Sequence, residues 1–251
     1  MNPKETTNSK KSFSTIYILH YFKLVWRSAL FIMVLVCYIL DKIDVLKTIA
    51  FVPLVVWIVL VAEMILRFFP SRFETMGCQK QFARNYEPID GNSAPINQSW
   101  KRTALVAAVW LLLNAVIGVF YFAGIFDAGL LFLIAIGFSV CDVICILFFC
   151  PFQTWFMKNR CCTTCRIYNW DFAMMFTPLV FVPRVYTYTL LGFALLILIR
   201  WEVTYRLHPE RFSTATNKCV DCSRCEEKLC HHKKQLRGFL KKYRTRFFLS
   251  K

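Results

Sequence analysis

Residues 103–126 read TALVAAVWLLLNAVIGVFYFAGIF and contain no charged side chain. After Asp127 the chain becomes apolar again, and residues 128–150 contain one charge, Asp142. A helix that crosses a bilayer needs about 20 mainly apolar residues, and both runs reach that length. The two runs therefore predict a pair of membrane-spanning helices joined by a short turn.

Similar apolar runs occur along much of the chain, which is 57% hydrophobic and contains 25 Phe among its 251 residues. Such a composition is too apolar for one soluble domain of this length. Two prolines and Arg184 interrupt the last apolar region, which predicts a broken or re-entrant final element. We expect an all-α fold, a polytopic membrane helical bundle of five to six segments within residues 1–201, with segments at about 22–40, 48–66, 103–126, 128–150, 169–182 and 185–201.

The positive charges of the chain predict its orientation. The net charge is +16, and basic residues concentrate before the first run, in the connector 67–102, and after the fourth run. Loops rich in Lys and Arg remain in the cytoplasm. The tail 202–251 is also basic, so an even number of crossings, with a turn near Pro183 and Arg184, is expected. The sequence thus predicts a multi-pass protein of the cell membrane with its N-terminus and C-terminal tail in the cytoplasm.

Two groups of four cysteines fall on this predicted cytoplasmic side. In a reducing compartment, clustered cysteines are more often metal ligands than disulfides. We therefore expect metal ligands at Cys150, Cys161, Cys162 and Cys165, which follow the fourth run, and at Cys219, Cys222, Cys225 and Cys230 in the tail.

The spacing of the tail cysteines favours an iron-sulfur cluster as the cofactor. Cys219, Cys222 and Cys225 are separated by two residues each, which resembles the start of the bacterial C-x2-C-x2-C-x3-C-P run, although the last gap here is four and no proline follows. Zinc is the alternative, with Cys162 and Cys165 as one arm and two tail cysteines as the other. The first interpretation predicts electron transfer at the membrane surface, to a quinone or a partner subunit. The second predicts a zinc-stabilised scaffold or accessory subunit.

The charged residues inside the apolar runs predict a third function. A carboxylate near the middle of a membrane helix is costly unless it is paired, so Asp142 is a candidate site residue in a small transporter. We expect Arg184 to be its partner. We also expect Glu63 to pair with Arg67 one turn away, and Lys23 and Arg27 to extend towards the lipid headgroups.

The end of the tail has the pattern of a basic amphipathic helix. Apolar residues recur at helical spacing over residues 236–247, and Lys and Arg occupy most of the other positions. This pattern predicts binding to anionic lipids of the bilayer. Nucleic acid is not an expected partner, since no fold that reads it accompanies the charges.

Overall fold

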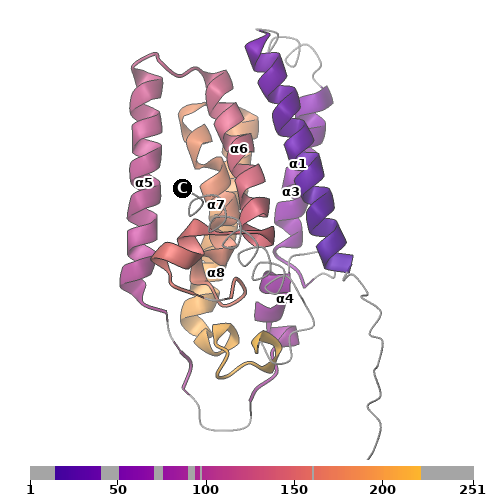
Figure 1. Ribbon diagram of the computed structural model, residues 1–251, viewed down its shortest axis with the longest axis vertical. Coiled ribbons are helices and arrows are strands. Elements are labelled where there is room, and N and C mark those ends of the chain that lie inside the picture. The colour runs from indigo at the N-terminus through magenta and orange to yellow at the C-terminus, as the bar shows by residue number, and fades with distance from the viewer. Residues whose placement is uncertain are drawn as a thin grey trace, which may run out of the picture.

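In the part of the chain that the structure describes, the elements of secondary structure are helices, with one isolated β-bridge between Pro88 and Asn217 (Figure 1). This computed structural model describes residues 15–40, 51–70, 76–89, 94–96, 98–159 and 161–221. The α-helices are α1 (Thr15–Ile39), α3 (Phe51–Leu66), α4 (Met76–Gln81), α5 (Trp100–Phe122), α6 (Ala128–Leu147), α7 (Asp171–Phe176) and α8 (Val185–Leu207). Tighter or wider turns occur at η1 (Ala83–Asn85), η2 (Phe152–Phe156), η3 (Arg166–Trp170), η4 (Thr177–Phe181), η5 (Pro209–Phe212) and η6 (Lys218–Val220).

Helices α5 and α6 form the hairpin that the sequence predicts. The chain leaves α5 through Gly124, whose φ of 74° is a backbone conformation that glycine adopts without strain. Asp127 then caps α6, because its carboxylate accepts the backbone N–H of Leu130 at 2.7 Å. Three described helical stretches are long and apolar enough to cross a membrane: Ile18–Ile39, Trp100–Phe122 and Ala128–Leu147.

Helix α1 packs against α6 in the opposite direction. The rings of Tyr21 and Phe148 meet edge to face at 6.3 Å, so the start of α1 lies beside the end of α6. Further along α1, Leu30 and Val34 share a core cluster with Leu133. Helix α1 therefore covers one side of the hairpin.

Helix α3 runs parallel to α8. The indole N–H of Trp57 donates to the Thr189 hydroxyl at 2.9 Å, and the Arg200 guanidinium lies 5.2 Å from the ring centre of Phe68. The main core lies between these helices and α7, where the side chains of Met64, Met175, Leu179 and Ile197 are almost fully buried.

The segment from α7 through η4 forms a short limb that runs opposite to α8. It begins at Asp171, which pairs with Arg67 just after α3, and reaches Val182, which packs with Ile117 and Leu131 near the α5–α6 turn. Helix α8 then returns from residue 185 (Figure 1). The chain thus reverses next to Pro183 and Arg184, where the sequence places the break.

Polar segments from three parts of the chain assemble at one end of the bundle. We call the described residues within 79–98, 157–170 and 202–221 the cap. The Gln81 side-chain amide donates to the carbonyl of Thr163 at 2.5 Å and accepts from Asn169 at 2.8 Å. The backbone N–H of Lys218 donates to the Glu87 carbonyl at 2.8 Å. The cap therefore joins the connector after α3, the loop after α6 and the start of the tail.

A bidentate ion pair fixes the end of α8 to the cap. The Arg166 guanidinium donates to both carboxylate oxygens of Glu202, which also accepts the indole N–H of Trp170 at 2.9 Å. Helix α8 continues to Leu207, so the predicted boundary between a membrane domain and a tail at residue 202 falls inside this helix. The basic amphipathic segment 236–247 lies outside the described residues.

Candidate functional site

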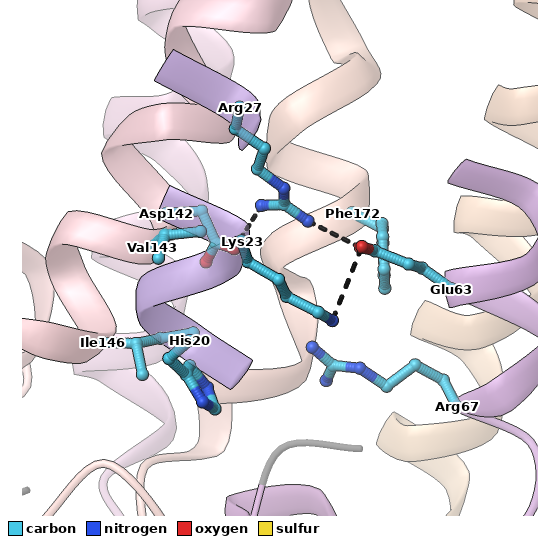
Figure 2. A pocket seen from close by; sticks show the side chains of 9 residues that line it. All are labelled: His20, Lys23, Arg27, Glu63, Arg67, Asp142, Val143, Ile146 and Phe172. Carbon is cyan, nitrogen blue, oxygen red and sulfur yellow. Dashed lines mark hydrogen bonds and ion pairs between the residues drawn. The ribbon is translucent and has the colours of Figure 1, made fainter. Parts of the chain in front are cut away.

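Charged side chains from three helices meet between α1, α3 and α6 (Figure 2). Arg27 of α1 donates to Glu63 of α3 at 2.7 Å and to Asp142 of α6 at 3.2 Å. It also donates to the backbone carbonyl of Ser139 at 2.9 Å, and Lys23 Nζ lies 3.6 Å from Glu63. Two cations thus face two carboxylates. Because these charges balance, Arg27 can be buried, with 4% of its surface exposed. We call these four charged residues the Arg27 network.

A second ion pair lies beside the Arg27 network, towards the cap. Arg67 pairs with Asp171, and its guanidinium lies over the ring of Phe172 at 5.2 Å from the ring centre. Arg67 also donates to the Asn169 side-chain oxygen at 3.3 Å. A small cavity lies between the two groups (Figure 2). The Arg27 network, Arg67 and His20 line it, together with the apolar side chains of Val143, Ile146 and Phe172. The charged groups in this lining suit a water molecule or a small ion.

The predicted pairing of Asp142 with Arg184 is wrong, because Arg27 is the partner of Asp142. Arg184 precedes α8 near the α5–α6 turn, as the packing of Val182 against Leu131 shows. At 1.5 Å per residue, Asp142 lies about 16 Å further along α6 than Leu131. The two side chains therefore lie at different heights in the bundle.

The expected extension of Arg27 towards the lipid headgroups is also wrong. Arg27 is buried within the protein and does not extend towards headgroups. Glu63 pairs with Arg27 and Lys23, while Arg67 pairs with Asp171. The sequence contains one overlooked signal: His20, Lys23 and Arg27 recur at helical spacing, which places three polar side chains on one face of α1.

The loop after α6 holds Cys161 and Cys162 as thiols within a hydrogen-bonded turn. The Cys162 thiol donates to the side-chain oxygen of Gln153 at 3.0 Å, and Cys161 lies 2.8 Å from the Thr163 hydroxyl. Both thiols are half-buried. Their sulfur atoms have polar partners from the same loop.

Cys165 differs from these two because it is buried in an apolar cluster with Met157 and Ile167. Burial raises the pKa of its thiol, and the nearby sulfur of Cys162 adds to that effect. The neutral thiol is therefore the form that the packing of the loop favours.

Cys219 is held at the surface of the cap. Its backbone N–H donates to the Asn217 side-chain oxygen at 3.0 Å. Partial burial, followed by the charge of Glu87, raises the pKa of the Cys219 thiol. The other predicted tail ligands, Cys222, Cys225 and Cys230, lie outside the described residues.

The cap thus brings the loop that contains Cys161, Cys162 and Cys165 to the same end of the bundle as Cys219. Across the described ranges, no three Cys, His, Asp or Glu side chains converge closely enough to hold a metal ion. The cysteines that the structure describes therefore do not form a complete ligand set among themselves.

Over the described residues, the fold and this site define a helical protein with three helices long and apolar enough to cross a membrane and a polar cap with cysteines. No protein-family description matches the chain, and neither a curated protein nor a solved structure is similar to it. Function is therefore argued from the residues alone.

Proposed function

We propose that this protein is a multi-pass membrane protein whose tail cysteines bind an iron-sulfur cluster and pass electrons at the cytoplasmic surface. The supporting observation is the anchoring of Cys219, the first of these four cysteines, on the cap. The amide of the fully buried Asn217 donates to the carbonyls of Lys80 at 3.2 Å and Arg211 at 2.9 Å. These bonds hold the start of the motif against two connectors of the bundle.

The directions in which the helices run support this placement of the motif. Helices α1 and α5 and the α7–η4 limb run towards the end opposite the cap, while α3, α6 and α8 run towards the cap (Figure 1). Six passages would leave both the N-terminus and the tail on the cap side. The connectors at that end carry most of the basic charge, which favours the cytoplasm.

The donor set fits an iron-sulfur cluster, because Cys219, Cys222, Cys225 and Cys230 would supply four thiolates from one short stretch of sequence. A bound cluster would supply one-electron chemistry at the membrane surface. The cap would fix the position of the motif, and a quinone or a partner subunit would be the redox partner. Zinc is the alternative metal, with Cys162 and Cys165 as the second arm, since both arms lie at one end of the bundle.

Metal analysis of the full chain tests this proposal. The protein would be purified without oxygen in detergent, and its iron, acid-labile sulfide, zinc and visible absorption would be measured. We expect a brown protein with iron and sulfide in equal amounts, and loss of both in Cys222→Ser. The matched variant Cys37→Ser, in α1, should retain them. A colourless protein with stoichiometric zinc would support the scaffold function, and a protein without metal would overturn both.

Transport of a proton or small cation is a second candidate function. The observation that favours it is the cavity beside Asp142 and Glu63, which two carboxylates and His20 line (Figure 2). Uptake into proteoliposomes that contain a pH-sensitive dye would test it. Transport that is lost in Asp142→Asn, while the metal content is retained, would support this function, and equal rates in both proteins would exclude it.

A further inference from the structure

Basic side chains from two segments gather at the cap end of α5. The Arg102 guanidinium, at the start of α5, donates to the carbonyl of Met157 in the loop after α6 at 3.2 Å. Val106, one turn further along α5, is fully buried in a cluster with Met157. Lys158 follows Met157 directly, and Lys101 precedes Arg102. These contacts bring Lys101, Arg102 and Lys158 to one edge of the bundle, and we call these three residues the basic edge.

The basic edge is open to the surroundings of the protein. All three side chains are exposed, and among the described residues no carboxylate forms an ion pair with them. Three less exposed arginines, Arg27, Arg67 and Arg166, each pair with a carboxylate. A guanidinium has five N–H donors, and Arg102 uses one nitrogen for its bond to Met157. The basic edge therefore presents positive charge to a partner outside the chain.

Lys158 has a backbone conformation that favours glycine. Its φ is 50°, and it is the one described residue other than glycine with a positive φ. The N–H of Met157 donates to the Phe152 carbonyl at 2.9 Å, and the N–H of Asn159 donates to the Gln153 carbonyl at 3.0 Å, so the turn closes around Lys158. Glycine would adopt this conformation at a lower cost. Backbone strain of this kind often marks a functional residue, and the exposed ammonium group is what lysine adds here.

Exposed tryptophans accompany the basic edge on both segments. Trp100 precedes Lys101, and Trp155 lies two residues before Met157; the two tryptophans are 68% and 66% exposed. The helical stretch of α5 that is apolar enough to cross a membrane begins at Trp100. Trp concentrates where the hydrocarbon of a bilayer meets the headgroups. The basic edge thus lies at the depth of the lipid headgroups.

We propose that the basic edge binds the headgroup phosphate of an anionic phospholipid in the leaflet next to the cap. Arg102 offers planar N–H donors and the two lysines offer point charges, and both kinds of group bind phosphate oxygens well. Unpaired cations also favour a lipid with a net negative charge over a zwitterionic one. The inference rests on the membrane placement in the proposed function, but it does not depend on the metal centre.

Photocrosslinking of the full chain in lipid nanodiscs tests the proposal. The nanodiscs would contain phosphatidylcholine and a small fraction of phosphatidylglycerol with a diazirine near its headgroup, and crosslinked peptides would be identified by mass spectrometry. We expect crosslinks in the peptides that contain residues 100–102 and 155–158, which separates this site from the predicted lipid-binding segment 236–247. Equal crosslinking there by phosphatidylcholine with the same diazirine would overturn the proposal. Competition by soluble glycerol phosphate would overturn the choice of a lipid as the source of the phosphate.

Lys158→Gly separates lipid binding from the fold of the loop. Glycine relieves the backbone strain, so the Tm should not fall. Crosslinking of both peptides should fall about fivefold, which is what one basic residue contributes near an anionic surface. Lys158→Arg should retain the crosslinks. The matched control Arg84→Gln removes one exposed cation from another part of the cap and should leave them unchanged.

Two results with these variants would overturn the proposal. A lower Tm in Lys158→Gly would show that this lysine serves the fold of the loop. An equal loss of crosslinks in Arg84→Gln would show that only the overall charge of the cap attracts the lipid. Cys222→Ser should lose the proposed cluster and retain the crosslinks, so failure of the metal centre and failure of the lipid site give different results.

Discussion

Arg27 in α1 and Asp142 in α6 form an ion pair at 3.2 Å between residues that are 115 positions apart in the sequence. Glu63 of α3 contacts the same guanidinium, so one cation connects three helices. An arginine with a carboxylate on either side is a fixed junction for these helices. Its removal would leave two carboxylates with much less compensation.

Arg27→Met should therefore destabilise the protein strongly. Breaking a buried charge pair from one side costs about 3–5 kcal/mol, because the remaining charge loses most of its compensation. For a chain of this size, that loss corresponds to a fall in Tm of roughly 6 °C or more. Thermal unfolding in detergent, followed by tryptophan fluorescence, would measure it.

The control for this variant is Arg184→Met, which removes an exposed arginine that was expected from the sequence to pair with Asp142. Its ΔΔG should stay within about 0.5 kcal/mol, as for most surface changes. A larger loss of stability in Arg184→Met than in Arg27→Met would contradict the assignment of Arg27 to Asp142.

The sequence predicts the helical hairpin well and the Arg27 network poorly, for a physical reason. A helix that crosses a bilayer must be long and apolar. Both properties of residues 103–126 can be read from that segment without knowing the rest of the fold. The partner of Asp142 depends instead on which helix packs against α6, which is a long-range property of the fold. The helical spacing of His20, Lys23 and Arg27 indicates that α1 has a polar face. It does not identify which carboxylates pack against that face.

A close contact between Gly118 and Phe181 should make α5 intolerant of a larger residue at this position. A Cβ atom on Gly118 would lie 2.5 Å from the tip of the Phe181 ring. That ring packs against Tyr121 and Phe122, so it has little room to move. Gly118→Ala should cost about 1–3 kcal/mol, the usual range for overpacking, and thermal unfolding would detect it.

Gly192→Ala is the matched control, because Gly192 also lies inside a long helix and no atom lies within 4 Å of its added Cβ. This change should be neutral or stabilising by up to about 1 kcal/mol, the difference in helix propensity between the two residues. In Gly118→Ala, a second change of Phe181→Leu should recover part of the loss. Equal stability of the two alanine variants would show that the contact does not limit packing.

Labelling from the two sides of the membrane should separate the cap from the opposite end of the bundle. In intact cells, an impermeant maleimide should react with Ala123→Cys and Arg184→Cys more than with the parent protein. Ala94→Cys and Thr214→Cys, both in the cap, should gain label only after permeabilisation. All four positions are exposed in the structure. Label on Thr214→Cys in intact cells would contradict the proposed six-passage topology.

The cap illustrates a second limit of sequence-based prediction. The cysteine groups and their spacing are visible in the sequence, and positive charge predicts their shared side of the membrane. The residues that join the two regions are neutral amides such as Gln81 and Asn217, which have no distinctive spacing. Their role depends on which backbone carbonyls reach them, so it emerges only from the assembled cap.

Asn217→Ala should release Cys219 from the cap. The buried Asn217 amide donates to two carbonyls, and its oxygen accepts the Cys219 N–H, so alanine leaves these groups without partners. Each unsatisfied buried group costs about 1–3 kcal/mol. In metal-free protein, Cys219 should therefore react with maleimide several times faster than in the parent, as measured by peptide mass spectrometry. Thr214→Ala, an exposed change in the same segment, should leave the rate unchanged. If Asn217→Ala also leaves it unchanged, the anchoring of the tail motif depends on other contacts.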